Sequence, residues 1–205
     1  MSRVFFTADT HFGHAGIIGM CHRPFGNIEE HDRGLIENWN AVVQPDDVVW
    51  FLGDFAYRTR PQNIRRIFDM LHGTKHLVIG NHDHGKPGKV SATLQLPWAS
   101  QHEQIEVAAE DGTTLVLNHY SLRVWRNMRR GAVQLYGHSH GSLPGTRQCI
   151  DVGVDNFGYA PVSWLQIKSR LAMLPALDFR PDTDEVEQLK RPEAVPAEES
   201  VLPTP

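Results

Sequence analysis

Three short, mainly apolar runs in the first 80 residues each end on polar side chains able to bind metal ions. The runs cover residues 3–8, 47–52 and 76–79, and they lead into Asp9, Gly53-Asp54 and Gly80-Asn81. Runs of this length that end at turn residues are typical of buried β-strands. The sequence therefore predicts three strands, each with a polar cluster at its carboxyl end.

Two segments with helical periodicity separate these runs. The first begins at Asn27, a favourable N-cap with Glu30 three residues later, and continues to about Val43 with its apolar residues on one face. The second begins at Pro61, a favourable first residue of a helix. Alternation of strands and helices predicts right-handed crossovers and a parallel sheet. Because ligands of such sheets bind at the carboxyl ends of the strands, the polar clusters are expected to meet there.

The second half of the chain predicts a further, mixed sheet. Glu110-Asp111-Gly112 is a hairpin signal between two alternating segments, and a short helix is expected around 124–130. The expected strands are 104–109, 113–117, 133–136, 148–152 and 163–167. We expect an α/β fold of two packed mixed β-sheets flanked by helices, with the polar loops along one edge.

Length and charge divide the chain at about residue 175. A chain of 205 residues that is 40% apolar is long enough for one sizeable core, so residues 1–175 are expected to form one domain. Residues 181–205 contain seven acidic and two basic residues, a net charge of −5, which leaves +1 of the total −4 for the first 180. Five prolines lie in the same stretch. We expect residues 176–205 to be a disordered acidic tail.

Two cysteines and the absence of long apolar runs indicate the compartment. Cys21 and Cys149 are too few for a disulfide framework and form no Cys-x-x-Cys motif. The N-terminus lacks the apolar core of a signal peptide, and no apolar run approaches the roughly 20 residues that span a membrane. A cytoplasmic protein without membrane association is expected.

Five clusters along the chain carry Asp, Asn and His side chains. They are Asp9-Thr10-His11, Gly53-Asp54, Gly80-Asn81-His82-Asp83, Asn118-His119 and Gly137-His138-Ser139-His140. Carboxylate, imidazole and amide ligands without thiolates suit Mn²⁺, Fe²⁺, Zn²⁺ or Ni²⁺. One cluster alone is weak evidence, because Asp and His are common at turns. Five in order, most of them preceded by glycine, predict two metal ions that clamp a phosphoryl group between them.

The order and spacing of these clusters resemble the motifs of the calcineurin-like metallophosphoesterase superfamily over about residues 4–155. The Asp-Thr-His-Phe-Gly-His motif followed by Arg23-Pro24-Phe25 resembles a small single-domain bacterial and phage-type branch. The resemblance implies a four-layer α/β/β/α sandwich with two divalent ions. Mn²⁺ is the first expectation, with Fe, Zn and Ni as alternatives.

The resemblance also implies a role for each matching position. The first ion would be bound by Asp9, His11 and His140, the second by Asn81, His119 and His138, and Asp54 would bridge the two. His82 would face the scissile phosphate and protonate the leaving oxygen, while Asp83 would hold its imidazole in the required tautomer.

Two further residues are candidates for contact with the substrate. His14 follows His11 by three residues and either contacts substrate, supports a ligand or is an ordinary loop histidine. Arg123 is the arginine nearest to His119 in this stretch of sequence, and its guanidinium is suited to bidentate phosphate binding. The alternative for the arginines at 126, 129 and 130 is a solvated helix face.

The expected activity is hydrolysis of a phosphodiester by a hydroxide that bridges two metal ions. The expected substrate is a nucleotide-like or other small phosphoester, with a diester preferred over a monoester. The reason is that Phe55-Ala56-Tyr57-Arg58 replaces the Asp-Arg-Gly typical of the superfamily's protein phosphatases. Hydrolysis of a phosphomonoester is an alternative. Nucleic-acid ends are the alternative substrate, disfavoured by the near-neutral charge of the domain. A non-catalytic metal-binding scaffold is a third hypothesis. Against it, the chain has His82 and a suitable residue at every ligand position, whereas a scaffold is expected to have lost one or more of them. Protein partners are not predicted by the sequence.

Overall fold

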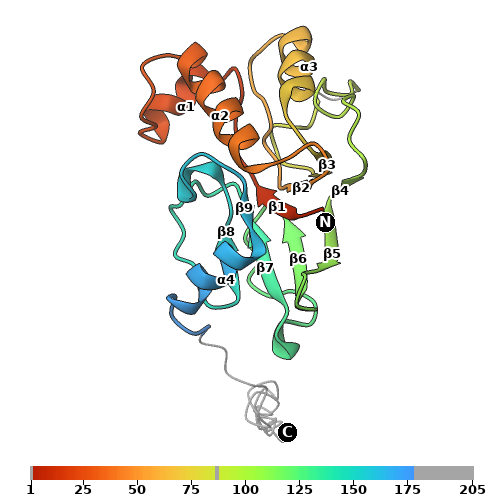
Figure 1. Ribbon diagram of the computed structural model, residues 1–205, viewed down its shortest axis with the longest axis vertical. Helices are drawn as coiled ribbons and strands as arrows, with labels where there is room; N and C mark the ends of the chain where they lie inside the picture. The colour runs from red at the N-terminus through yellow and green to blue at the C-terminus, as the bar shows by residue number, and fades with distance from the viewer. Residues whose placement is uncertain (1, 86–87, 178–205) are drawn as a thin grey trace, which may run out of the picture.

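Two β-sheets packed face to face, with helices around them, make up the computed structural model, which describes residues 2–85 and 88–177 (Figure 1). The expected α/β class of two mixed sheets flanked by helices is confirmed. Of the expected acidic tail 176–205, all but residues 176 and 177 lie outside the described residues.

The first sheet has five strands in the order β4-β3-β2-β1-β9. Strands β1, β2 and β3 are parallel, as expected, with Val4 opposite Val48 and Val48 opposite Thr74. Strand β4 extends the parallel set, and β9 pairs with β1 in the antiparallel direction. The bounds are β1 Val4–Thr7, β2 Val48–Phe51, β3 Thr74–Val78, β4 Gln101–His102 and β9 Val162–Ser163.

Two amphipathic helices cover one face of this sheet (Figure 1). Helix α2 spans Ile28–Val42 and begins at the expected N-cap, where the Asn27 side chain accepts a hydrogen bond from the backbone N–H of Glu30 at 2.8 Å. Helix α3 spans Pro61–Met70. Their apolar faces pack on β1–β3 in a core that includes the fully buried Trp39. A short helix α1, Ala15–Met20, was not expected from the sequence.

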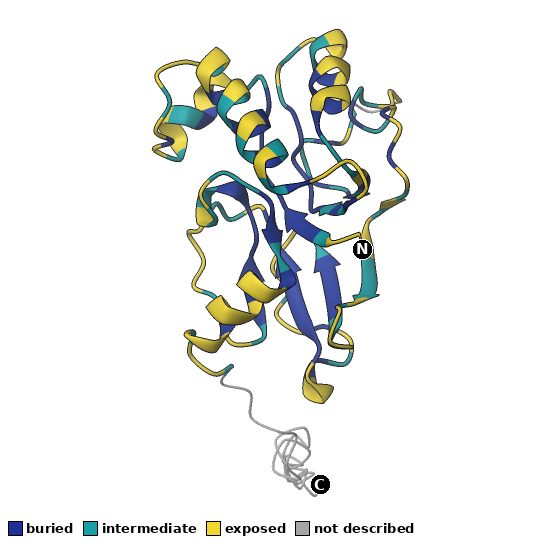
Figure 2. Cartoon of the chain, viewed as in Figure 1, coloured by how far each residue is buried: buried dark blue, intermediate teal, exposed yellow. Residues whose placement is uncertain are grey.

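The second sheet has the order β5-β6-β7-β8. Its strands are β5 Gln104–Ala108, β6 Thr114–Asn118, β7 Val133–Tyr136 and β8 Cys149–Asp151. The predicted hairpin is confirmed, since β5 and β6 are antiparallel, whereas β6, β7 and β8 run parallel. A continuous core fills the space between the sheets, with Phe6 and Leu52 from the first and Leu117 and Leu135 from the second. Buried residues accordingly concentrate along the strands (Figure 2).

The predicted strand at 163–167 is wrong. Strand β9 ends at Ser163, and helix α4, Trp164–Ala172, begins at the next residue. The Ser163 side chain accepts a hydrogen bond from the backbone N–H of Gln166, and the Gln166 side chain accepts one from the backbone N–H of Ser163. This reciprocal capping box fixes a helix start that the alternation of apolar residues had masked.

The expected short helix around 124–130 is reduced to η1, a single 3₁₀ turn at Met128–Arg130. Asn127 and Gly131 flank it in the left-handed conformation, with φ of 59° and 88°, so the helix cannot extend in either direction. Trp125 and Met128 from this segment cover the outer face of the second sheet. A second 3₁₀ turn, η2, spans Val154–Asn156.

The loops that follow β1, β2, β3, β6 and β7 therefore meet along one edge of the two sheets, where the polar clusters lie. Within residues 2–85 and 88–177, every helix is too short or too polar to cross a membrane.

Candidate metal centre

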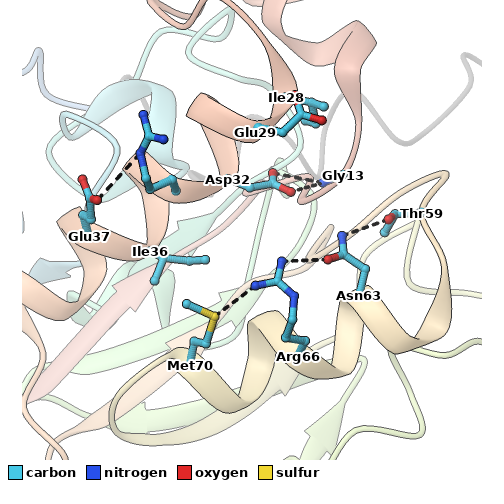
Figure 3. A pocket seen from close by; sticks show the side chains of 11 residues that line it. Gly13, Ile28, Glu29, Asp32, Ile36, Glu37, Thr59, Asn63, Arg66 and Met70 are labelled. Carbon is cyan, nitrogen blue, oxygen red and sulfur yellow. Dashed lines mark hydrogen bonds and ion pairs between the residues drawn. The ribbon is translucent and has the colours of Figure 1, made fainter.

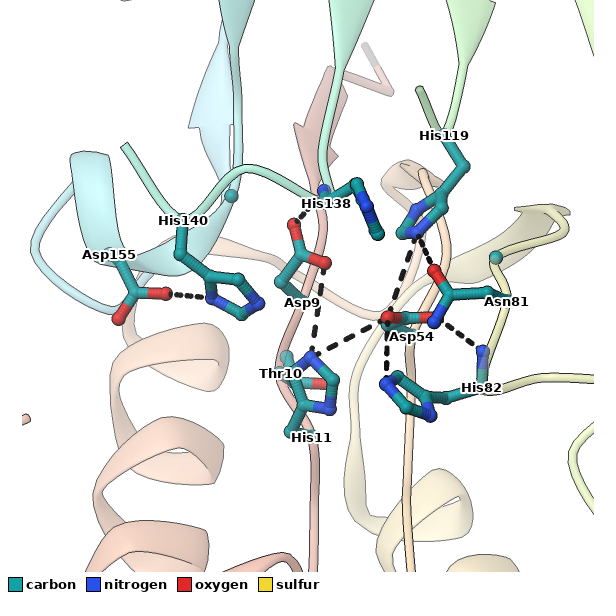
Figure 4. Close-up of polar contacts among 12 residues, drawn as sticks. Asp9, Thr10, His11, Asp54, Asn81, His82, His119, His138, His140 and Asp155 are labelled. Carbon is teal, nitrogen blue, oxygen red and sulfur yellow. Dashed lines mark hydrogen bonds and ion pairs between the residues drawn. The ribbon is translucent and has the colours of Figure 1, made fainter. Parts of the chain in front are cut away.

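The loop after β1 is tied to the loop after β2 by backbone hydrogen bonds. The N–H of Asp9 donates to the carbonyl of Gly53 at 2.9 Å, and that of His11 donates to the carbonyl of Asp54 at 3.0 Å. Asp9, His11 and Asp54 all adopt left-handed backbone conformations, with φ of 59°, 51° and 62°. These conformations turn the three side chains toward one another beyond the ends of the strands (Figure 4).

The first group of candidate metal ligands is Asp9, His11 and His140, whose potential ligand atoms all lie within 4.8 Å of one another. The Nδ1–H of His140 donates to Asp155 at 2.7 Å, which leaves Nε2 with its lone pair available. Asp9 Oδ1 and both ring nitrogens of His11 are buried without a hydrogen-bond partner among the described residues. Buried polar atoms without partners are costly, and a bound cation would satisfy Asp9 Oδ1 and one His11 nitrogen.

The second group is Asp54, His119 and His138. The Nδ1–H of His119 donates to the carbonyl of Leu52 at 2.7 Å, so its Nε2 carries a lone pair. That Nε2 lies 3.0 Å from Asn81 Oδ1 and 3.6 Å from Asp54 Oδ2 (Figure 4). Burial lowers the pKa of His119, which favours the neutral ring. Three atoms with lone pairs, His119 Nε2, Asn81 Oδ1 and Asp54 Oδ2, therefore lie close together. This arrangement fits a cation.

Burial and neighbouring charges of the same sign shift the pKa values of the side chains in the centre. Burial, with the nearby charges of Asp151 and Asp54, raises the pKa of Asp9 well above its ordinary value. Burial also lowers the pKa of His11, and its neighbours His140 and Arg23 lower it further. The centre thus combines buried carboxylates with neutral imidazoles, the donor set that divalent ions of the Mn²⁺ to Zn²⁺ series accept.

His82 differs from the buried histidines in its exposure. Its side chain is 32% exposed, against 2% for His11 and 1% for His119. The backbone N–H of His82 donates to Asp54 Oδ1 at 2.8 Å, and Nε2 lies 3.9 Å from Asp54 Oδ2. The ring of Tyr57 packs against the imidazole with the two centroids 4.2 Å apart. His82 is therefore anchored at the centre and open to a substrate.

The expected partnership of Asp83 with the His82 imidazole is wrong. The Asp83 carboxylate is buried and accepts backbone N–H bonds from Asp54 at 2.8 Å, Phe55 at 3.0 Å and Gly80 at 2.9 Å. Burial and the Asp54 charge raise the pKa of Asp83 to about 7, against the effect of these donors. The Asp83 carboxylate is therefore occupied by backbone donors, and it fastens the loop after β2 to the loop after β3.

The two candidate substrate contacts occupy different places. His14 lies at the rim of the centre, with its ring centroid 5.7 Å from that of His11 and 4.9 Å from that of Tyr57. Arg123 is exposed, and no hydrogen bond or ion pair within the described ranges joins it to a candidate ligand. The structure thus brings His14 to the centre and gives Arg123 no contact with it.

Sequence reasoning did not identify several residues that line the centre. Tyr57 packs on His82, and Tyr120 lies with its ring centroid 5.0 Å from His119 and 4.8 Å from His138. Asp155 supports His140 from η2. Each tyrosine lies close in sequence to a predicted ligand cluster, which is the signal that could have drawn attention to it, whereas Asp155 follows no cluster.

A pocket of about 550 Å³ between α2 and α3 is separate from this centre (Figure 3). Its lining includes Asp32, Arg66 and Met70, and it contains none of the candidate ligands. Its lining also includes Gly13, two residues after His11, whose backbone N–H donates to both carboxylate oxygens of Asp32 at 3.1 Å. The candidate metal centre itself lies in the loops at the sheet edge.

Gly53 is required by close approach of three loops, and we predict that Gly53→Ala is strongly destabilising. Its φ is +91°, and an added Cβ would lie 2.4 Å from His119 Nδ1 and 2.7 Å from the Cα of Gly80. Left-handed strain and steric overlap together should lower the free energy of unfolding by about 3 kcal/mol or more. Urea denaturation of the metal-free protein measures this loss. Gly112→Ala is the matched control, because Gly112 also has a positive φ but open space around it.

Comparison with known proteins gives a family match and several relatives. The model of the calcineurin-like phosphoesterase family matches residues 2–157. The uncharacterized protein MJ1445 of Methanocaldococcus jannaschii is 32% identical over 171 residues, which cover 80% of this chain and 88% of that protein. The Gene 66 proteins of Mycobacterium phages L5 and D29 are 28% and 30% identical, over 77% and 76% of this chain and 89% of each phage protein.

A solved structure shares the fold. The crystal structure of AQ665, a protein of unknown function from Aquifex aeolicus, superposes with a TM-score of 0.63 at 23% sequence identity, covering 83% of this chain and all of that one. The family match spans every strand end that carries a candidate ligand. The chain belongs to the calcineurin-like phosphoesterase family.

Proposed function

We propose that the protein is a dinuclear-metal-dependent phosphodiesterase that acts on a small, nucleotide-like phosphodiester in the cytoplasm, with Mn²⁺ as its metal. The observation that carries the proposal is that two candidate ligand groups lie side by side, with Asp54 Oδ2 of the second group 3.6 Å from His11 Nε2 of the first, beside an accessible histidine. The first ion would be held by Asp9, His11 and His140, and the second by Asn81, His119 and His138. Asp54 would contact both.

When bound, two such ions would supply Lewis acidity and lower the pKa of a coordinated water. The residues of the chain would do the rest. Asp54 fixes the position of His82 through the backbone hydrogen bond at 2.8 Å, and Tyr57 restricts the swing of the imidazole. His82 would then donate a proton to the leaving oxygen, a contribution typical of general acids in phosphoester hydrolysis.

Hydrolysis of two chromogenic esters tests the proposal. With Mn²⁺, we expect turnover of bis-p-nitrophenyl phosphate to exceed that of p-nitrophenyl phosphate, and EDTA to abolish both. Faster cleavage of single- or double-stranded oligonucleotides than of the small diester would favour a nuclease. If no ester in a broad panel of nucleotide diesters, cyclic nucleotides and monoesters is hydrolysed, the non-catalytic scaffold is the better description.

Metal removal should lower the melting temperature. An ion present at 100 times its dissociation constant stabilises the folded state by about 2.7 kcal/mol, and in a protein of this size each kcal/mol is worth roughly 2 to 4 °C. We therefore expect Mn²⁺ to raise Tm by roughly 5 to 10 °C per ion over the EDTA-treated protein. Differential scanning calorimetry measures the shift. Equal Tm values with saturating Mn²⁺ and with EDTA would contradict it.

A further inference from the structure

We propose that Arg23 and Asp155 are positioning residues that hold the first ligand group, Asp9, His11 and His140, and set the affinity of that metal site alone. The inference rests on the dinuclear centre proposed above. Arg23 comes from the Arg23-Pro24-Phe25 motif of the sequence, to which the proposed reaction gives no role. Its side chain is fully buried, at 0% exposure.

Arg23 joins the two chain segments that carry this ligand group. Its Nη2 donates to the backbone carbonyl of Asp9 at 2.7 Å, and its Nη1 donates to that of Thr10 at 2.9 Å. Its Nε and Nη2 also form a bidentate pair with Asp155, both bonds at 2.8 Å. A planar guanidinium can make this set of bonds, whereas an ammonium group cannot.

Asp155 transmits this constraint to the third ligand. Its Oδ2 accepts the Nδ1–H of His140 at 2.7 Å (Figure 4), which fixes the ring with Nε2 toward Asp9 and His11. A carboxylate behind a metal-binding histidine orients the ring and raises its basicity. One guanidinium thus supports the backbone of the Asp9-Thr10-His11 cluster directly and the His140 ring through one carboxylate.

A second set of contacts holds Arg23 from behind. Its Nη1 lies 2.8 Å from His31 Nε2, and because arginine only donates, that nitrogen is the acceptor and Nδ1 carries the proton. Nδ1–H then donates to Asp32 at 2.9 Å, and Asp32 accepts the backbone N–H of Gly13 (Figure 3). Helix α2 therefore fixes both the guanidinium and the loop beyond His11.

The second ligand group is held differently. His119 is oriented by the carbonyl of Leu52, and the backbone N–H of His138 donates to Asp9 Oδ2 at 2.8 Å. Within the described residues, neither Arg23 nor Asp155 hydrogen-bonds to Asn81, His119 or His138. Loss of the Arg23–Asp155 pair should therefore weaken one of two metal sites. A general loss of structure would weaken both, and this difference separates positioning from a merely structural role.

The test is an equilibrium titration of metal-free protein with Mn²⁺, in which free Mn²⁺ is followed by electron paramagnetic resonance. For wild type we expect two bound ions. For Asp155→Asn and Arg23→Lys we expect one site weakened by about 10- to 100-fold and the other within about twofold of wild type. Asp111→Asn is the matched control, because Asp111 pairs with Lys168 on the far side of the molecule and should leave both constants unchanged.

The outcomes separate this inference from the proposed function. Fewer than two ions in wild type would overturn the dinuclear centre and the inference with it. Two ions in wild type with both constants unchanged in Asp155→Asn, or both weakened equally, would overturn the inference alone. If circular dichroism shows that Arg23→Lys does not fold, the two Mn²⁺ binding constants of Asp155→Asn still test the inference. As a second readout, the Mn²⁺ concentration for half-maximal hydrolysis should rise by the same factor, with kcat recovered at saturating Mn²⁺.

Discussion

Replacement of His82 by alanine should lower kcat for bis-p-nitrophenyl phosphate by about 10²- to 10⁴-fold, the usual contribution of a general acid, while two Mn²⁺ ions remain bound. The imidazole is half-buried beside Asp54 and accessible on one side, and its backbone is anchored independently of its ring. Removal of the ring therefore takes away a proton donor without loosening the loop. The effect should appear in kcat more than in KM, since the proton is needed in the transition state.

His84→Ala is the matched control, because His84 is an exposed histidine two residues away. It should retain wild-type turnover. Metal content measured by plasma emission spectroscopy decides the role of His82. Its ring also lies within ligand distance of His11 and Asp54, so loss of an ion from His82→Ala would identify it as a metal ligand and remove the basis for its role as proton donor.

Asp54→Asn is expected to lower the activity strongly and, in the metal-free protein, to raise the melting temperature. Asparagine keeps the shape and the acceptor of the hydrogen bond from the His82 N–H, but it removes the charge that lies 3.6 Å from both His11 of the first ligand group and His119 of the second. Loss of metal should lower activity by about 10³-fold or more, in line with the several kcal/mol that metal ions contribute to phosphoryl transfer.

The metal-free form of the same variant should be more stable than metal-free wild type. The Asp54 charge raises the pKa of both Asp9 and Asp83, which means that the buried carboxylates repel one another. Relief of that repulsion should raise Tm in EDTA by roughly 2 to 4 °C, equivalent to about 1 kcal/mol. Asp46→Asn, an exposed isosteric change, is the control. A lower Tm for Asp54→Asn in EDTA would contradict the argument.

The sequence predicted the part of the centre that depends on strand ends. Asp9, Asp54 and Asn81 follow three consecutive parallel strands, and the rule that such ends share one edge predicted that they lie together, as they do in Figure 4. The N-cap at Asn27 and the proline at the start of α3 located the helices for equally local reasons. Strand ends and helix starts that are determined by a few neighbouring residues could therefore be predicted from the sequence.

Features that depend on distant contacts were not predicted. Arg23 and Asp155 are 132 residues apart, and neither has a local pattern that indicates the other. Asp83 adjoins His82 in sequence, yet three backbone donors occupy its carboxylate, and proximity in the chain suggested the wrong partner. Helix α4 was missed because apolar residues at 162, 164 and 167 suit either a strand or a helix, and its capping box was the deciding signal.

Five of the seven candidate ligands, namely Asp9, His11, Asp54, His138 and His140, have a positive φ. For residues other than glycine, such a backbone conformation costs about 1 to 3 kcal/mol of stability. Substitution by glycine at any of these positions would therefore relieve backbone strain and at the same time delete a candidate ligand. A mutant library selected only for resistance to heat in the presence of a chelator should therefore lose these candidate metal ligands first. Directed evolution of a more robust variant needs selection for turnover in every round.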